Sequence, residues 1–205
     1  MLKNIIFDFG GVLLNIDFKR TFDAFRQLGY EEFDEMYNHD AANPLFQNLE
    51  TGIISDVEFY DRLNAILPYP STNVQLREAW CAMLLGYKKE SLEFLTTLKD
   101  NYNLYLLSNT NIIHYKRFSS MLKEETKYER LDDFFTMAWY SHEIRLRKPD
   151  VGTYEYVLNE AGIKPEDTLF IDDSQVNLPN AEKLGIKTHL FKPGERIEEI
   201  DYGSY

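Results

Sequence analysis

Short apolar runs recur along the chain and are separated by segments in which hydrophobic residues have helical spacing. The runs that predict strands span residues 4–9, 104–107, 134–139, 168–171 and 188–191. Continuous apolar runs of this kind are typical of strands that are buried on both faces. Strands that alternate with helices favour a parallel sheet with crossover helices. The pattern therefore predicts an α/β protein with a Rossmann-like parallel sheet.

Helical patterns lie between most of these runs. Leucine recurs at helical spacing over residues 90–99, and residues 150–161 and 180–184 continue as helices until Gly162 and Gly185 end them. A glycine directly after the last apolar position of a helix is a common stop signal. These helices are the crossover connections that a parallel sheet requires.

The segment between the first strand and Lys89 has helical patterns but no convincing strand. Phenylalanine recurs at helical spacing from Phe18, and a capping box at Ser55 begins a further helix. A helical block placed after the first strand of a parallel α/β core lies above the carboxyl ends of the strands, where such sheets bind ligands. We therefore predict a core domain over residues 1–15 and 88–205, with an inserted helical cap domain over residues 16–87.

Composition indicates an ordinary globular protein and narrows the class of its partners. The 205 residues are 44% hydrophobic and 27% charged, and 14 Tyr and 14 Phe supply large core side chains. The formal net charge of −12 opposes binding to nucleic-acid phosphates and to anionic membrane surfaces. The sequence has no concentrated basic patch that would offset this field, so we expect no nucleic-acid or membrane partner.

The N-terminus and the cysteine content favour a cytoplasmic protein. The chain reaches Asp8 after only a few apolar residues, without a signal-peptide core or cleavage site. No apolar run approaches membrane-spanning length. Cys81 is the single cysteine, which cannot form an internal disulfide and is expected to pack as a small apolar residue. A cytoplasmic location is the default expectation, and the oligomeric state stays open between a monomer and a weak dimer.

Acidic residues follow two of the predicted strands. Asp8 ends the first strand, and Asp172 and Asp173 end a later one. Because the carboxyl ends of parallel strands meet at one edge of a sheet, we expect the three carboxylates to lie close together. Either raised pKa values or a hard divalent cation relieves their repulsion, and oxygen ligands without nearby His or Cys suit Mg²⁺ rather than Zn²⁺. We predict a magnesium site, with ordinary turn or capping aspartates as the alternative.

Two further motifs suit a phosphate. Ser108, Asn109 and Thr110 directly follow another strand and offer hydroxyl and amide donors at the start of a helix. Without their context such residues are equally typical of a helix N-cap. Lys148 lies just before a predicted helix, where its charge offsets that of a nucleophile and of phosphoryl oxygens. The alternative is one more surface lysine.

Residues outside these motifs give weaker indications. Glu50, Thr51 and Gly52 either face the substrate or form a plain connecting turn. The histidines have no ligand spacing, and we interpret them as surface or structural residues. They are His39, His114, His142 and His189.

The four motifs, taken in order, resemble those of the haloacid dehalogenase-like superfamily. They read FDFGGVL, LLSNTN, RKP and FIDDSQVN in this chain, and the resemblance spans nearly the whole sequence. The helical insertion after the first motif resembles the four-helix type of cap. Residues 7–18 and 46–59 are most similar to bacterial sugar-phosphate phosphatases of the alpha-glucose-1-phosphate phosphatase kind, and to the phosphatase half of soluble epoxide hydrolases.

The resemblance implies a Mg²⁺-dependent phosphatase that hydrolyses a small phosphorylated metabolite, with a sugar phosphate foremost. Asp8 would attack phosphorus, and water would hydrolyse the resulting aspartyl-phosphate. Ser108 and Asn109 would hold the phosphoryl group, which Lys148 would neutralise. The implied Mg²⁺ ligands are Asp8, the carbonyl of Gly10 and the Asp172–Asp173 pair, with Asp173 the direct ligand and Asp172 farther from the ion.

Gly10 departs from the common pattern of the superfamily. Most of its phosphatases carry a second aspartate two residues after the nucleophile, which protonates the leaving group and activates water. Such general acid–base help contributes about 10²–10⁴-fold, and Asp17 is the nearest substitute in the sequence. The glucose-1-phosphate phosphatase relatives also tend to show glycine here.

This departure keeps two alternatives open. One is a weakly catalytic or non-catalytic ligand-binding protein with the same fold. The other is a metal-independent dehalogenase, although dehalogenases of the superfamily lack the adjacent acidic pair that is present at Asp172 and Asp173.

Overall fold

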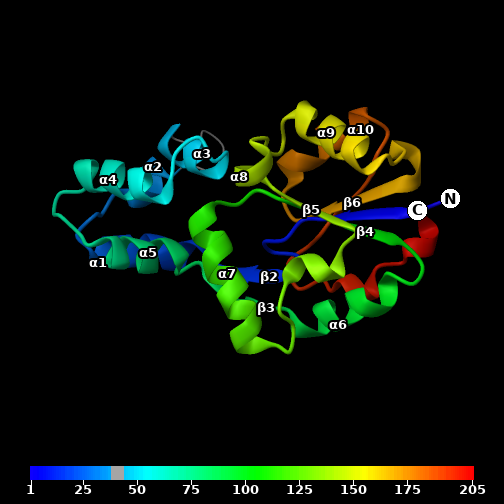
Figure 1. Ribbon diagram of the computed structural model, residues 1–205, viewed down its shortest axis with the longest axis horizontal. Helices are drawn as coiled ribbons and strands as arrows, with labels where there is room; N and C mark the ends of the chain where they lie inside the picture. The colour runs from blue at the N-terminus through cyan, green and yellow to red at the C-terminus, as the bar shows by residue number, and fades with distance from the viewer. Residues whose placement is uncertain (38–43) are drawn as a thin grey trace.

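A five-stranded parallel sheet forms the centre of the protein (Figure 1). The computed structural model describes residues 1–37 and 44–205. Neighbouring strands are parallel throughout this sheet. Their spatial order is β5 (Met137–Tyr140), β4 (Asn103–Ser108), β1 (Asn4–Phe7), β6 (Thr168–Asp172) and β7 (Lys187–Leu190). The predicted α/β class with a parallel sheet is therefore confirmed.

Helices cover both faces of the sheet because alternate residues of each strand point to opposite sides. Ile5 and Phe7 of β1 share a buried cluster with leucines of α6, whereas Ile6 packs with Tyr154 of α9 and Leu178 of α10. Figure 1 shows α6 and α7 on one side of the sheet, with α9 and α10 on the other. The helices are α6 (Lys89–Leu98), α7 (Ile112–Glu125), α8 (Ser141–Ile144), α9 (Val151–Ala161) and α10 (Leu178–Lys183).

A block of helices lies at one end of the molecule (Figure 1). It has its own hydrophobic cluster, in which the rings of Phe25 and Phe33 stack with centroids 3.7 Å apart and Phe46 stacks on Trp80 at 5.3 Å. The expected capping box at Ser55 is present. The helices are α1 (Phe18–Gln27), α2 (Phe33–Met36), α3 (Pro44–Glu50), α4 (Asp56–Ile66) and α5 (Asn73–Cys81). The predicted helical insertion is confirmed.

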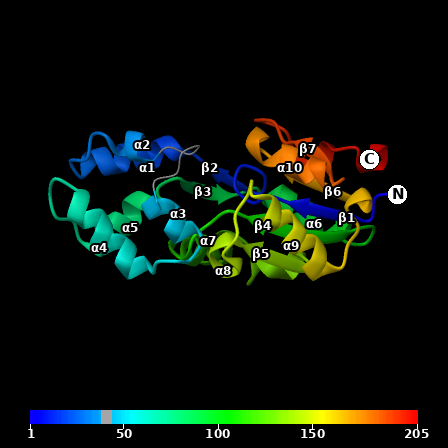
Figure 2. The ribbon, with the colours of Figure 1, turned by 90° about the horizontal axis from the view of Figure 1, so that it is seen from above.

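Two short strands connect the helical block to the sheet, so the expectation of no strand before Lys89 is wrong. β2 (Leu14–Ile16) pairs antiparallel with β3 (Leu84–Tyr87). Figure 2 shows them side by side between the inserted helices and the sheet. They are three and four residues long and partly exposed, so neither forms a continuous apolar run. Such strands are set by pairing rather than by local pattern.

Short 3₁₀ segments lie in several of the connections between helices and strands. One of them displaces the start of the expected strand over residues 134–139 to Met137. Both termini lie at the end of the molecule away from the inserted helices (Figure 1). The 3₁₀ segments are Leu131–Phe134, Pro165–Asp167, Gln175–Asn177, Ile197–Glu199 and Tyr202–Ser204.

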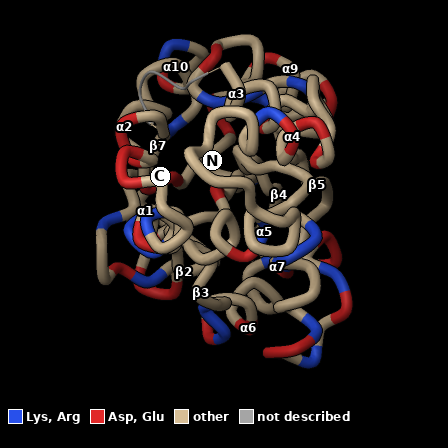
Figure 3. Tube along the Cα trace, turned by 90° about the vertical axis from the view of Figure 1, so that its left-hand side faces the viewer, with Lys and Arg blue, Asp and Glu red and all other residues tan. Residues whose placement is uncertain are grey.

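The surface of the helical block carries both signs of charge. Figure 3 shows basic and acidic segments interspersed over this end of the molecule. Several pair along one helix, as do Arg26 and Asp23 of α1 at 3.2 Å. Across the described ranges, no helix combines the length and the apolar character that a membrane span requires.

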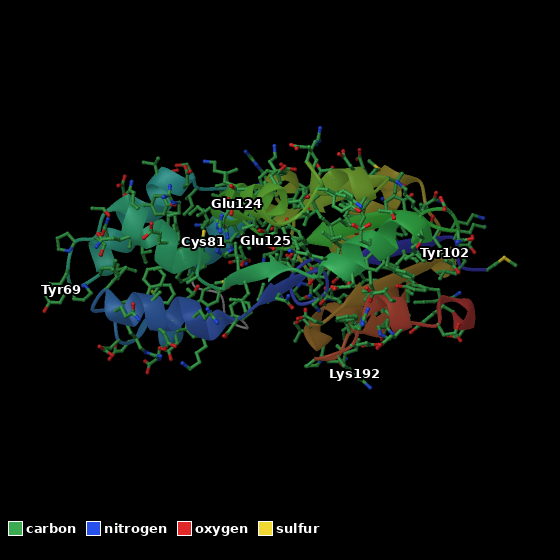
Figure 4. All side chains as sticks on the ribbon, turned by 90° about the horizontal axis from the view of Figure 1, so that it is seen from below. Tyr69, Cys81, Tyr102, Glu124, Glu125 and Lys192 are labelled. Carbon is green, nitrogen blue, oxygen red and sulfur yellow. The ribbon has the colours of Figure 1, made fainter. Side chains whose placement is uncertain are left out.

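Cys81 lies where the inserted helices meet α7 (Figure 4). It packs partly buried against the hydrophobic cluster of the helical block and lines a surface groove with Lys116 and Ser120 of α7. Burial raises the pKa of its thiol to about 12, so the thiol stays protonated at neutral pH. The expectation that Cys81 packs as a small apolar residue is confirmed.

Candidate active site

Three aspartates meet at the carboxyl edge of the sheet. Asp8 follows β1, while Asp172 ends β6 and Asp173 follows it. The parallel register places Phe7 beside Ile171, so the two strand ends are adjacent. One oxygen from each of the three carboxylates lies within 4.8 Å of the other two. The structure thus brings together the acidic residues that the sequence singled out.

Lys148 is buried among these carboxylates. Its Nζ lies 2.7 Å from Asp8 Oδ1 and 2.6 Å from Asp172 Oδ2, and its side chain is only 1% exposed. Burial opposes the charged form, but the contacts with Asp172 and Asp8 outweigh it and raise the pKa of Lys148. The lysine is therefore a charged partner of the cluster, and the surface-lysine alternative is wrong.

The two adjacent aspartates have different surroundings. Asp172 is fully buried, and its carboxylate accepts hydrogen bonds from Lys148, from Ser174 N at 2.8 Å and from Asn177 Nδ2 at 2.9 and 3.0 Å. Asp173 lies on the exposed side of the cluster. The Asp172 carboxylate is therefore occupied by protein donors, and that of Asp173 is the more accessible of the two.

The electrostatics of the cluster suit a divalent cation. Burial raises the pKa of Asp8 to about 7, and the charges of Asp172 and Asp173 add to this effect while Lys148 opposes it. Three carboxylates and one ammonium carry a net charge of −2 when all are ionised. Carboxylate oxygens are hard ligands, so this donor set fits Mg²⁺.

Of the two glycines that follow Phe9, Gly11 is required by the backbone and Gly10 is not. Gly11 has a φ of 73°, and a Cβ placed there would lie 2.0 Å from Asp173 Oδ2. Gly11 is therefore the residue that permits close approach to the acidic cluster. At Gly10 a Cβ would meet Ile16 Cδ1 at 3.2 Å, which a small movement of that flexible side chain relieves.

The motif after β4 is divided between several tasks. Ser108 is buried at the end of the strand. The side-chain amide of Asn109 donates to the carbonyl oxygen of Lys148 and accepts from the N–H of the same residue. No sequence signal indicated this link. Thr110 N donates to Ser141 Oγ at 2.9 Å. The N-cap of α7 is Asn111, whose Oδ1 accepts from two backbone N–H groups of the first turn, so the cap lies beyond the expected Ser108–Thr110 cluster.

A cavity of about 90 Å³ lies between this motif and the inserted helices. Ser108 and Asn109 line it from the sheet, and the aromatic rings of Phe18 and Trp80 line it from α1 and α5. Glu50 and Arg147 also line it and form an ion pair with 3.1 Å between Oε2 and Nη2. The sequence indicated Glu50 only weakly, and it marked Arg147 only as a neighbour of Lys148.

Other residues singled out in the sequence have structural contacts. Asp17 is the N-cap of α1 and accepts a hydrogen bond from Lys19 N at 3.0 Å. Gly52 has a φ of 63°, and a Cβ there would lie 2.1 Å from the carbonyl oxygen of His142. Gly52 therefore allows the inserted helices to approach α8 closely.

Two of the histidines have clear structural partners. His114 is buried, with Nε2 3.0 Å from the carbonyl oxygen of Trp80, and His189 lies between Tyr205 and Glu195. Burial lowers the pKa of both His114 and His142 to about 4, so each is neutral at physiological pH. His39 lies outside the described residues.

Comparisons with known proteins agree with the predicted family. The chain matches the haloacid dehalogenase-like hydrolase family over residues 2–185. It is 30% identical to D-ribitol-5-phosphate phosphatase from Bacteroides thetaiotaomicron, over 94% of this chain and 92% of that protein.

Two solved structures have the same fold over nearly their whole length. One is a family enzyme from Bacteroides thetaiotaomicron in complex with magnesium and inorganic phosphate, with a TM-score of 0.86, 32% identity and coverage of 96% of this chain and 98% of that one. The other is a predicted family hydrolase from Porphyromonas gingivalis, with a TM-score of 0.87, 31% identity and coverage of 95% and 93%. With its acidic cluster at the strand ends and this sequence match, the chain belongs to the haloacid dehalogenase-like hydrolase family.

Proposed function

We propose that this protein is a Mg²⁺-dependent phosphatase that hydrolyses the phosphomonoester of a sugar or sugar alcohol through an aspartyl-phosphate on Asp8. The observation that carries the proposal is the cluster of Asp8, Asp172 and Asp173 around the buried ammonium of Lys148. The comparisons support it, since a curated relative is a D-ribitol-5-phosphate phosphatase and a similar solved structure holds magnesium and inorganic phosphate.

In this proposal the residues of the chain divide the work of phosphoryl transfer. The Asp8 carboxylate attacks phosphorus, the bond to the ester oxygen breaks, and water then releases phosphate from Asp8. Asp8, the carbonyl of Gly10 and Asp173 would hold Mg²⁺, which would withdraw charge from the phosphoryl oxygens. Lys148 favours the ionised form of Asp8, because its Nζ donates a hydrogen bond to that carboxylate.

The phosphoryl group would be held by the motif after β4. Ser108 contributes its hydroxyl, and the backbone N–H of Asn109 contributes a second donor. The Asn109 side chain is bonded to the Lys148 backbone, so its role is to position the lysine. Fixed donors aimed at transferring oxygens stabilise charge without reorganising during the reaction.

We further propose that the inserted helices form the substrate-binding cap, with residues 16–87 as the cap and residues 1–15 and 88–205 as the core. The cavity between Ser108 and Trp80 supports this division, because both parts of the chain line it. Within the family, the similarity of residues 7–18 and 46–59 to alpha-glucose-1-phosphate phosphatases and to the phosphatase half of epoxide hydrolases points in the same direction.

Two arguments favour a phosphatase over the alternatives. A dehalogenase that needs no metal has no need for Asp173 beside Asp172, and a pure binding protein has no need for a lysine-paired nucleophile. The test is turnover of a panel of phosphomonoesters by the purified protein, with Mg²⁺ and after chelation. We expect Mg²⁺-dependent phosphate release that Asp8→Asn abolishes. Metal-independent halide release, or equal turnover by Asp8→Asn, would contradict the proposal.

A further inference from the structure

The ion pair between Glu50 and Arg147 joins the inserted helices to the sheet inside the cavity. Glu50 is the last residue of α3, and Arg147 directly precedes Lys148. Their side chains are 13% and 15% exposed, and the nearest oxygen and nitrogen are 3.1 Å apart. Both residues line the same cavity as Ser108 and Asn109. A charged pair from two distant segments therefore lies beside the place where the substrate is proposed to bind.

The position of Glu50 is fixed by the backbone that follows it. Gly52 lies so close to α8 that any Cβ would overlap the carbonyl oxygen of His142. Contacts between α3 and α8 hold this part of the insertion against the sheet domain. Arg147 is equally constrained, because the backbone of the next residue is bonded to Asn109. The pair is thus held at both ends and does not depend on two freely rotating surface side chains.

Burial of this ion pair lowers the stability of the fold unless the pair also binds a polar ligand. Removing two charges from water carries a desolvation penalty that their mutual attraction often fails to repay. The nearby Tyr37 is partly buried, and its pKa is raised first by burial and then by the charge of Glu50. Its ring packs edge-on against Trp80 at 5.4 Å, which gives this end of the cavity an aromatic wall. Polar groups on an apolar wall are typical of sites that orient a small ligand.

We propose that Glu50 and Arg147 bind the hydroxyl groups of the substrate's carbon chain and make the enzyme prefer polyhydroxylated phosphates over hydroxyl-free ones. This inference rests on the proposed function. A carboxylate accepts hydrogen bonds from two neighbouring hydroxyls, while the guanidinium donates to hydroxyl oxygens from its planar fork. Ser108 and Asn109 mark the phosphate end of the cavity, and the ion pair marks the hydroxyl end.

The test compares two substrates that share a five-carbon chain and a primary-alcohol leaving group, ribitol 5-phosphate and n-pentyl phosphate. We expect Glu50→Gln to lower kcat/KM for ribitol 5-phosphate about 10- to 100-fold, because charge-assisted hydrogen bonds to the hydroxyls are lost. The loss should appear mainly in KM, and kcat/KM for n-pentyl phosphate should change less than about threefold.

Asp56→Asn is the matched control. Asp56 pairs with Lys116 at 2.7 Å and also links an inserted helix to the sheet domain, but it lies in the surface groove rather than in the cavity. This variant should affect both substrates equally. If Glu50→Gln also lowers both equally, or leaves the preference for ribitol 5-phosphate intact, the pair is only a structural link and the proposal is wrong.

A second variant and a binding measurement separate the possible failures. Arg147→Lys keeps the positive charge but loses the planar donors of the guanidinium. If Glu50→Gln does not fold, Arg147→Lys should show the same selective loss of kcat/KM for ribitol 5-phosphate. If wild type hydrolyses neither ester, the panel of phosphomonoesters decides the proposed function separately. Calorimetry with ribitol 5-phosphate and inorganic phosphate then decides the inference. The inference is supported if wild type binds ribitol 5-phosphate more tightly than inorganic phosphate and Glu50→Gln loses this difference. Equal affinities in wild type would overturn it.

Discussion

Both polar atoms of the Asn109 side chain form hydrogen bonds with the backbone of Lys148. Nδ2 donates to the Lys148 carbonyl oxygen at 2.8 Å, and Oδ1 accepts from the Lys148 N–H at 2.9 Å. The lysine in turn donates to Asp8 at 2.7 Å. The loop after β4 therefore sets where the positive charge lies relative to the nucleophile.

Replacement of Asn109 should reduce activity without removing any group that reacts. In Asn109→Ala both hydrogen bonds to the Lys148 backbone are lost, and a displacement of about 1 Å at a reacting centre costs on the order of 10²-fold in rate. We expect kcat to fall by about that factor. Asn109→Asp keeps the acceptor and should lose less. Steady-state kinetics with wild-type rates in Asn109→Ala would show that the link does not position the lysine.

Removal of the Lys148 ammonium should destabilise the fold as well as impair turnover. Lys148→Met leaves Asp8 and Asp172 buried without their cation, and breaking a buried charge pair typically costs about 3–5 kcal/mol. Urea unfolding measures this loss. Adding Asp8→Asn in the same chain removes one of the stranded carboxylates and should recover part of it. A Lys148→Met protein with wild-type stability would mean that the cluster accommodates the unpaired charges.

The raised pKa of Asp8 gives a pH dependence of stability in the absence of metal. Because burial raises its folded-state pKa to about 7 from 3.8, the folded protein binds the proton more tightly than the unfolded chain. The stability that Asp8 contributes is therefore present below about pH 4 and is lost as the pH rises to 7. With EDTA, Asp8→Asn should exceed wild type in stability at pH 8, by on the order of 2–4 kcal/mol, and by much less at pH 5. A difference that does not grow with pH would contradict this interpretation.

Magnesium should stabilise the folded protein through the acidic cluster. At a concentration one hundredfold above the dissociation constant, a ligand of the folded state adds about 2.7 kcal/mol, which raises Tm. Asp173→Ala should remove most of the increase. Asp133→Ala changes a carboxylate that is 67% exposed in a different segment, and it should keep the full increase. Thermal denaturation that shows no Mg²⁺ effect in wild type would contradict the predicted metal site.

The glycine at position 10 predicts a dependence on the leaving group. Without a carboxylate there, the first step relies on esters whose alcohol departs readily. We expect kcat/KM to favour aryl and anomeric phosphates over phosphates of simple alcohols. Asp17 is the N-cap of α1, and Asn is an equally good N-cap. We therefore expect Asp17→Asn to change the dependence of kcat/KM on the leaving group little. Fast turnover of alkyl phosphates with a flat dependence would reveal another general acid.

The sequence was sufficient for the parts of the molecule that depend on local pattern and on strand ends. The apolar runs before Asp8 and Asp172 predicted two central strands, and the geometry of parallel sheets then placed both aspartates at one edge. Gly162 and Gly185 were predicted to end helices, and each follows a helix in the structure with a positive φ. These features follow from residues near one another in the chain.

Features that depend on contacts between distant segments were not predicted. The pairing of β2 with β3 joins two short, half-exposed segments whose strand character comes only from each other. The link from Asn109 to Lys148 and the pair of Glu50 with Arg147 likewise cross the fold, and a single sequence contains no periodicity that marks them. The motif suggests that Asn109 binds phosphate, and no local pattern indicates that its side-chain amide bonds the Lys148 backbone.

The β2–β3 ribbon has a mechanical consequence for the nucleophile. Both chain crossings between the inserted helices and the sheet run through it, so a rotation of the helices about the ribbon's long axis acts as torsion on its two strands. Leu14 O accepts from Gly11 N at 2.8 Å, and Leu13 O accepts from Lys88 N at 3.0 Å. The Lys88 side chain also donates to the Gly11 carbonyl oxygen. A rotation of the helices would therefore act first on Gly11 and Leu13, which follow Asp8 by three and five residues, before it reached the rest of the sheet.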